Sequence, residues 1–290
     1  MSARRHEQRS AWLLAAPAVV VMAGFALYPI VVTLWLSLRR TLLVFHEDRF
    51  VGLEHYAFLL RDPRFWSALG TTSYFTAVSV SIELLLGLAF ALLLDASFPG
   101  RGAMRAIVLV PWAIPTVVSA KLWAWLFNPD YGLLTHVLGG GDVNFLGTPG
   151  WAMHAAILAD VWKTTPFVAL LLLGGLQSIP RELYLAAQVD GASRARTLRT
   201  ITLPLLLPTI VVTLVFRTLD AFRVFDAVYV LTDGGPANST ETLSIYAYKT
   251  LIRIGDFGYG STLAITTFLL VAIVAAGYLM LMRRAARRTA

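Results

Sequence analysis

The sequence lacks cysteine and has few charged residues, and both features exclude classes of function. Without a thiol, the 290-residue chain can form no disulfide and no zinc–thiolate site. Its five histidines show no spacing that would place two ligands on one face, so we expect no metal site. The sequence contains no G-x-x-x-x-G-K-S/T motif, so the chain is not expected to bind ATP as a P-loop protein does.

Long apolar blocks dominate the sequence instead. Hydrophobic residues make up 57% of the chain and charged residues 14%, which is more apolar than a soluble domain. A transmembrane helix needs about 20 mainly apolar residues to cross the hydrocarbon core. Six blocks have this length: 11–38, 67–94, 103–127, 151–177, 204–231 and 261–282. The first exceeds the signal-peptide core of about 7–15 residues, so we expect a retained span.

This pattern predicts an all-α, polytopic membrane protein in which residues 1–290 form one transmembrane domain of six helices. The outer loop 39–66 mixes charges of both signs with aromatic residues and is expected to form a small folded cap. Pro111 and Pro115 remove backbone donors from the third span and should bend it.

The basic residues are distributed unevenly across the predicted topology. If the N-terminus is cytoplasmic, 13 of the 24 lysine and arginine residues lie on the cytoplasmic side, 7 in outer loops and 4 within spans. The 13 are Arg4, Arg5, Arg9, Arg101, Arg105, Arg181, Arg194, Arg196, Arg199, Arg283, Arg284, Arg287 and Arg288. This bias predicts cytoplasmic termini, and the net charge of +7 indicates contact with anionic lipid rather than nucleic acid.

The inner loop 178–203 has the pattern of a helix–turn–helix. Glu182 complements the positive end of a first helix, and Gly191 is suited to a left-handed C-cap. Ser193 can cap a second short helix that ends near Thr200.

Two interpretations of this loop remain open from the residues alone. Ala186 and Ala187 give the first helix a surface of low relief that another protein could approach, with Leu183 and Tyr184 as anchors. Alternatively, the segment is an amphipathic connector that packs on its own helical bundle.

The stretch ELYLAAQVDGA followed by ITLPLLLP resembles the EAA loop of permease subunits of binding-protein-dependent ABC importers. The matching positions are Ala186, Ala187, Asp190, Gly191, Ala192, Ile201, Leu203 and Pro204. Leu185 stands where this family usually has the glutamate that names the motif, although Glu182 lies nearby. This departure puts in doubt the polar contact that the glutamate makes with the ATPase.

Other stretches resemble the sugar branch of that family, the maltose- and glycerol-phosphate-type permeases. They are YPIVVTLWLSL and VFDAVYVLTDGGPANSTETLSIYAY, and the resemblance covers nearly the whole chain. The stretches VWKTTPFVALLLLGGL and FRTLDAFRVFDAVYVLT are similar to trehalose-type permeases of actinobacteria. The resemblance implies a type I ABC importer permease fold in the bacterial cytoplasmic membrane. It also implies a non-catalytic subunit that translocates a carbohydrate, such as trehalose or maltose.

The same resemblance implies the partners of this subunit. Two copies of a cytoplasmic ABC ATPase would bind ATP and magnesium, and this chain would bind no cofactor. The expected coupling residues are Glu182, Leu183, Tyr184, Ala186, Ala187, Asp190, Gly191 and Ala192. A second, homologous permease would complete a heterodimer. An extracytoplasmic sugar-binding lipoprotein would dock on the outer loop 232–260, at Gly234, Gly235 and Pro236.

Charged residues interrupt the fifth apolar block in the stretch RTLDAFRVFD, residues 217–226. On one continuous helix these charges would spread over half the circumference, and Asp160 and Lys163 would lie at a similar depth. A buried set of ion pairs and a polar wall of the translocation path are both compatible with this pattern. The expected path residues are Asp160, Lys163, Thr213, Phe216, Arg217, Asp220 and Arg223. Glu83 and Lys121 also lie within spans, where ion pairing is favoured over contact with substrate.

Two other classes of function fit part of the sequence. A proton-coupled carrier would explain the intramembrane charges but gives no reason for the inner loop. A non-transporting membrane scaffold would explain a docking loop but not a polar helix face in the middle of a bilayer.

Overall fold

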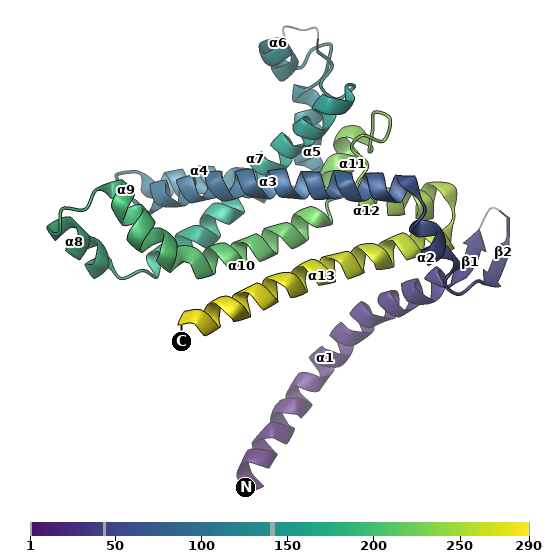
Figure 1. Ribbon diagram of the computed structural model, residues 1–290, viewed down its shortest axis with the longest axis horizontal. Coiled ribbons are helices and arrows are strands. Elements are labelled where there is room, and N and C mark those ends of the chain that lie inside the picture. The colour runs from purple at the N-terminus through teal and green to yellow at the C-terminus, as the bar shows by residue number, and fades with distance from the viewer. Residues whose placement is uncertain (1, 43–44, 140–142, 290) are drawn as a thin grey trace. The chain divides into compact units, whose positions relative to one another are not determined.

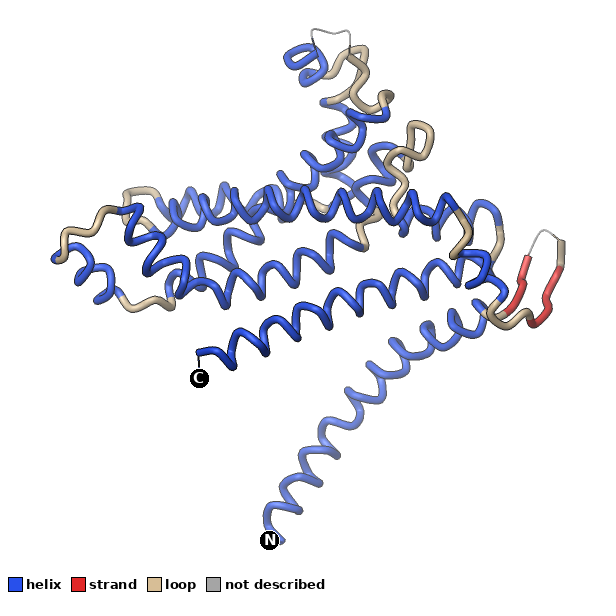
Figure 2. The backbone as a smooth tube through the Cα atoms, in the orientation of Figure 1, coloured by secondary structure: helices blue, strands red, loops and turns tan. Residues whose placement is uncertain are grey.

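A computed structural model describes residues 2–42, 45–139 and 143–289, and these residues are predominantly helical (Figure 1). One two-stranded hairpin interrupts the helical chain, as Figure 2 shows in red. The chain divides into two compact units. The first comprises Met1–Asp62 and Tyr246–Phe268, and the second Pro63–Ile245 and Leu269–Ala290.

The first unit contains the first long helix and the expected folded cap. Its elements up to Asp62 are α1 (Ser2–Ser37), β1 (Arg39–Leu42), β2 (Glu47–Phe50) and α2 (Glu54–Leu59). The strands pair in antiparallel register, from Arg39 opposite Phe50 to Leu42 opposite Glu47. A hydrogen bond from the Arg39 guanidinium lowers the pKa of the Asp48 carboxyl and ties the strands together at the surface.

The later part of the first unit contains η2 (Lys249–Ile254), a π-helical segment, and the start of α13 (Phe257–Thr289). The buried Asp62 carboxylate accepts hydrogen bonds from the hydroxyls of Tyr246 at 2.7 Å and Tyr259 at 2.6 Å. The Thr262 hydroxyl donates to the Ser37 carbonyl oxygen at 3.3 Å. These bonds hold together segments that are far apart in the sequence.

The second unit is a helical bundle. Its elements are α3 (Pro63–Asp95), α4 (Arg101–Ala113), α5 (Thr116–Leu126), α6 (Leu133–Gly139), α7 (Pro149–Gln177), α8 (Arg181–Val189), α9 (Arg194–Thr197), η1 (Leu198–Thr202), α10 (Leu203–Phe222), α11 (Asp226–Thr232) and α12 (Leu243–Tyr248), which ends in the first unit. The end of α13 also belongs to this unit. Helix α3 packs along α7, and α10 packs against both.

Two glycines allow these helices to approach closely. A Cβ atom on Gly87 of α3 would overlap the Val168 side chain of α7. A Cβ atom on Gly175 of α7 would overlap Thr209 and Leu206 of α10. Small residues at such positions are typical of packed transmembrane helices, where close van der Waals contact stabilises association.

The expected six spans are found as five helices and one broken pair. Five helices in the described residues are long and apolar enough to cross a membrane, and α4 with α5 makes a sixth span if counted together. The pair is bent by 90° at the break. Pro115 explains its position, because a residue before proline avoids helical geometry and Ile114 is extended, with ψ 132. The expected bend in the third span is therefore confirmed.

The fifth span differs from the sequence prediction of one helix over 204–231. Helix α10 ends at Phe222, and α11 begins only at Asp226. No proline or glycine marks the intervening residues. The interruption is stabilised from elsewhere in the chain, because the Thr242 hydroxyl donates to the Val224 carbonyl oxygen at 3.1 Å.

The start of the fifth span also differs from the prediction. The expected second helix of the inner loop does not end near Thr200 but continues through η1 into α10, giving a helical segment from Arg194 to Phe222. Pro204 therefore lies inside this segment rather than at its beginning. The π-helical turn of η1 ends at Thr202, two residues before the proline, and the backbone remains helical at Thr202.

Candidate functional site

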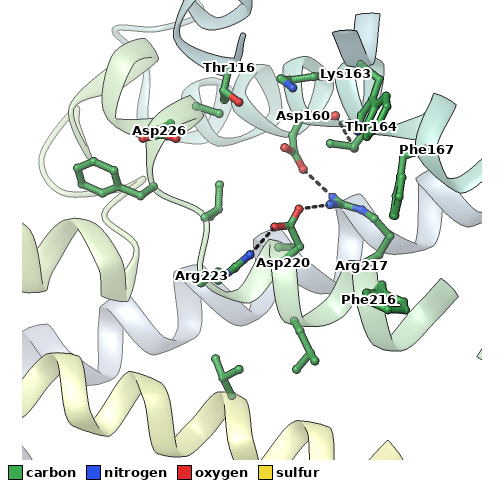
Figure 3. A pocket seen from close by; sticks show the side chains of 17 residues that line it. Thr116, Asp160, Lys163, Thr164, Phe167, Phe216, Arg217, Asp220, Arg223 and Asp226 are labelled. Atoms are coloured by element: carbon green, nitrogen blue, oxygen red, sulfur yellow. Dashed lines mark hydrogen bonds and ion pairs between the residues drawn. The ribbon is translucent and has the colours of Figure 1, made fainter. Parts of the chain in front are cut away.

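A cavity of about 790 Å³ lies in the second unit, between α4, α5, α7, α10 and α11 and the later part of α13 (Figure 3). This volume is in the range of about 300–1,000 Å³ that is usual for small-molecule sites. The residues that matter for its chemistry are Trp112, Thr116, Asp160, Lys163, Thr164, Phe167, Phe216, Arg217, Asp220, Arg223 and Asp226. Charged, hydroxyl-bearing and aromatic side chains thus line the same cavity.

Arg217 of α10 is the centre of the charged residues. Its Nε and Nη2 atoms donate to the two carboxylate oxygens of Glu83 at 2.6 and 2.8 Å. Nη1 donates to Asp220 at 2.5 Å, and Nη2 also donates to Asp160 at 3.3 Å. One guanidinium therefore links α3, α7 and the end of α10, and Figure 3 shows the bonds to Asp160 and Asp220.

Glu83 is completely buried on α3, and its oxygens are satisfied by protein donors. In addition to Arg217, the Thr164 hydroxyl lies 2.6 Å from Glu83 Oε1. The same hydroxyl lies 2.7 Å from the Asp160 carbonyl oxygen, and its single proton serves one acceptor at a time. The expected ion pairing of Glu83 is confirmed.

The other charges are held less tightly. Arg223 Nη2 lies 3.4 Å from Asp220 Oδ1, and both side chains are largely exposed. Lys163 lines the cavity at the expected depth, but it forms no ion pair with any described residue. Lys121 is exposed on α5, and within the described ranges it also forms no ion pair, contrary to expectation.

Aromatic side chains provide an apolar surface in the same cavity. The rings of Trp112 and Phe167 stack, with centroids 5.7 Å apart and an interplanar angle of 20°. Phe216 is also a cavity residue and is more than half exposed. Thr213, in contrast, does not line the cavity, because its side chain is buried and its hydroxyl donates to the Thr209 carbonyl oxygen one turn earlier.

The structure thus places six of the seven expected path residues around one cavity. Sequence reasoning missed the contributions of Trp112, Thr164 and Phe167, and it could not name the partner of Glu83. The sequence shows Glu83 as a lone charged residue in an apolar block, which indicates that it needs a partner. The identity of its partner depends on how α3 and α10 are aligned in space.

The inner loop forms the expected capped helix. Helix α8 ends in a left-handed residue, Gly191, with φ 69. The Gly191 amide donates to the Gln188 carbonyl at 3.1 Å and the Ala192 amide to the Ala187 carbonyl at 2.9 Å, which is a Schellman motif. The Ser193 hydroxyl accepts from the Arg196 amide at 3.3 Å and caps α9.

The expected coupling residues are divided between two faces of this segment. Ala187 is buried, and the Tyr184 hydroxyl lies 3.3 Å from that of Thr202, so both side chains contact their own bundle. The exposed residues of this segment are Arg181, Glu182, Leu183, Leu185, Ala186, Gln188, Val189, Asp190 and Gly191, while Ala192 is half-buried. Three of them, Leu183, Leu185 and Val189, give this face an apolar character.

The expected docking residues of the outer loop lie mostly below its surface. Gly234 is buried and Gly235 and Pro236, which are joined by a cis peptide bond, are half-buried. The exposed tip consists of Ala237 and Asn238. The buried side of the loop is fixed by Glu241, which accepts two hydrogen bonds of 2.7 and 2.8 Å from Arg64, and the two glycines and the proline support the tip.

The model of the family of binding-protein-dependent transport system inner membrane components matches residues 83–287. This chain belongs to that family. The resemblance to importer permeases that the inner loop indicated is therefore confirmed, and the chain is an inner-membrane permease component of a binding-protein-dependent transport system.

Curated relatives include permeases of sugar transport systems. The trehalose/maltose permease MalF of Thermococcus litoralis is 47% identical over 268 residues, covering 91% of this chain and 90% of the relative. The trehalose permease SugA of Mycobacterium tuberculosis is 44% identical over 284 residues, covering 98% and 92%. The sn-glycerol-3-phosphate permease UgpA of Salmonella typhimurium is 36% identical over 283 residues, covering 94% and 95%.

Solved structures show the same architecture. A chain of a bacterial ABC transporter involved in the import of the acidic polysaccharide alginate is 25% identical and superposes with a TM-score of 0.83, covering 98% of this chain and 99% of that chain. The alginate transporter in complex with its alginate-bound periplasmic protein gives a TM-score of 0.84 at 24% identity, covering 97% of each chain. The expected all-α, polytopic permease fold is confirmed.

Proposed function

We propose that this chain is a permease subunit of an ATP-driven importer that translocates a disaccharide such as trehalose or maltose. The observation that carries the proposal is the cavity, in which the carboxylates of Asp160 and Asp220 lie in the same space as the Trp112–Phe167 stack. The relatives MalF and SugA, named for trehalose or maltose, support this class of substrate.

The two kinds of side chain suit the two surfaces of a sugar. Hydroxyl groups of the substrate can donate to carboxylate oxygens, which are acceptors when ionised. The apolar CH face of a pyranose can pack on an aromatic ring. A translocation site must also release its ligand, so a few exposed contacts are preferable to complete enclosure. Asp220, whose side chain is 54% exposed, is suited to such a contact.

The inner loop is the proposed link to ATP hydrolysis. A cytoplasmic ATPase that binds ATP and magnesium would dock on the exposed face of α8, with Leu183, Leu185 and Val189 as apolar contacts. The buried contacts of Tyr184 and Ala187 would transmit motion of α8 to the bundle. Two global states with different access to the cavity then follow from two positions of α8.

The remaining partners are proposed from the family and the exposed surfaces. A sugar-binding protein would dock outside the cell on the loop 232–260, through the tip at Ala237 and Asn238. A second, homologous permease would complete the pathway as a heterodimer, and both termini would be cytoplasmic. Membership of the family of binding-protein-dependent transport components supports the importer function over a proton-coupled carrier or a non-transporting scaffold.

Reconstitution tests the proposal. The permease, its partner permease, the ATPase and the binding protein are placed in liposomes, and ATP hydrolysis is measured with a panel of sugars. We expect trehalose or maltose to stimulate hydrolysis and to accumulate inside the liposomes. Stimulation by unrelated ligands only, such as amino acids, would contradict the assignment.

A further inference from the structure

The Arg217 guanidinium lines a ligand-sized cavity, yet its hydrogen-bonding capacity is almost fully used within the protein. A guanidinium has five N–H groups in a planar fork that matches carboxylate and phosphate groups. Arg217 donates four hydrogen bonds to carboxylates of this chain, two of them to Glu83. The Arg217 guanidinium could otherwise bind an anion, but its N–H groups are occupied by carboxylates of this chain.

The charge around the cavity also disfavours the binding of an anion. Four carboxylates, Glu83, Asp160, Asp220 and Asp226, lie in or directly behind the cavity wall, against three cations, Arg217, Arg223 and Lys163. With all seven groups ionised, the described residues of the site carry a formal net charge of −1. In an environment of low dielectric constant, this net charge disfavours an anionic ligand.

Glu83 has a special position in the group because it is not a cavity residue. It lies on α3, fully buried, and its carboxylate accepts hydrogen bonds from the Nε and Nη2 atoms of Arg217. Asp160 and Asp220 hold the guanidinium from the cavity side. Replacement of the Glu83 carboxylate by an amide would leave at most one of the two bonds that fix the guanidinium orientation, because an amide has a single acceptor oxygen.

We propose that Glu83 is a specificity-determining residue that makes the cavity selective for uncharged sugars by sequestering the Arg217 guanidinium. This inference rests on the proposed function, because it concerns the ligand of the same cavity. Glu83 acts through Arg217 and does not touch the substrate, so it is a positioning residue. With Glu83 neutralised, Asp160 and Asp220 remain as the charged partners of the guanidinium, and the N–H groups released from Glu83 can donate to an anionic sugar.

The test measures ligand affinity in the purified permease complex. The binding protein is left out, so that the measured affinity is that of the site within the membrane domain. The probes are trehalose and glucose 6-phosphate, and affinity is obtained from the ligand-dependent shift in Tm. We expect Glu83→Gln to raise the affinity for glucose 6-phosphate by about tenfold or more, since a charge-assisted hydrogen bond contributes at least that much. The affinity for trehalose should change by less than about threefold, because the ligand is uncharged.

Two variants separate specificity from structural damage. Glu241→Gln is the matched control, because it also neutralises a buried glutamate in a bidentate pair with an arginine, Arg64, but outside the cavity. It should leave the affinity for glucose 6-phosphate unchanged. In the double variant Glu83→Gln/Arg217→Gln the gain should disappear, because the freed guanidinium is absent.

An unchanged affinity of Glu83→Gln for glucose 6-phosphate would overturn the inference, as would a gain that persists in the double variant. If Glu83→Gln does not accumulate in the membrane, Glu83→Asp carries the test, since it shortens the side chain and weakens the same two bonds. A smaller gain is then expected, and no gain overturns the inference. Failure of the wild type to bind trehalose or maltose would count against the proposed function alone, because the comparison of variants uses glucose 6-phosphate.

Discussion

The Arg217 guanidinium holds the Glu83 carboxylate through two hydrogen bonds of 2.6 and 2.8 Å, although 134 positions separate the residues in the sequence. Both side chains are buried, with exposed fractions of 4% and 0%. The pair fixes α10 against α3, and through Asp160 it includes α7. The interpretation of the intramembrane charges as interhelical ion pairs is therefore confirmed, and part of the same cluster lines the cavity that we propose as the translocation path.

Removal of the guanidinium should destabilise the protein strongly. We expect Arg217→Ala to lower the free energy of unfolding by about 3–5 kcal/mol, because Glu83 would remain buried without its main partner. Detergent titration of the purified protein, followed by circular dichroism, measures this change. Arg223→Ala is the control: its side chain is 71% exposed, and the expected change is within about 0.5 kcal/mol. Equal effects of the two substitutions would contradict the assigned role of Arg217.

The close approach of α7 and α10 gives a second prediction. Gly175→Ala should destabilise the protein by about 1–3 kcal/mol, because the new Cβ overlaps Thr209 and Leu206. The neighbouring Gly174 faces open space, so Gly174→Ala should be neutral or stabilising by up to about 1 kcal/mol. Thermal unfolding of both variants under one set of conditions measures the difference. A Gly174→Ala variant as unstable as Gly175→Ala would show that the helix contact is not the cause.

The turn after α8 gives a prediction about coupling. Proline cannot adopt φ 69 and lacks the amide that donates to Gln188, so Gly191→Pro should disrupt the Schellman motif. We expect uptake to be abolished while the protein still inserts into the membrane, as measured by transport and by immunoblotting of membrane fractions.

The control for this prediction is Gly100, which is also left-handed, with φ 84, and lies in the turn between α3 and α4. Gly191→Ala and Gly100→Ala introduce similar backbone strain, of about 1–2 kcal/mol. Only the substitution at Gly191 should reduce sugar-stimulated ATP hydrolysis. Normal ATP-driven uptake by Gly191→Pro would remove the coupling role of α8.

The aromatic wall of the cavity gives a prediction about affinity. Trp112→Leu removes the stacking partner of Phe167 and should raise the KM for sugar transport by about three- to tenfold, with little change in kcat. Trp125→Leu is the control, since Trp125 is exposed on α5 and packs near Tyr131 outside the cavity. Equal KM values for Trp112→Leu and the wild type would exclude a contact between this ring and the sugar.

The sequence was sufficient for features that depend on local chemistry. Hydropathy located the spans, and the conformational freedom of glycine located the cap at Gly191. Helix geometry brought Asp160 to the depth of Arg217, and the 3.3 Å contact between them agrees with that prediction.

Features that depend on tertiary contacts could not be predicted from the sequence. The interruption at Arg223–Phe225 has no proline or glycine, and it is stabilised by a hydroxyl group from Thr242. The partner of Glu83 is set by the alignment of three helices. Thr213 was misplaced because a threonine hydroxyl in a helix can bond to its own backbone instead of facing the cavity.

The interruption between α10 and α11 also bears on how the cavity changes shape. A continuous helix moves as a rigid rod, whereas a span divided at Arg223–Phe225 can pivot there without losing helical hydrogen bonds. Asp220 and Asp226 lie on opposite sides of this pivot. A displacement that begins at the Leu203 end of α10 can therefore alter the distance between these two carboxylates while α11 stays packed against α5 and α7.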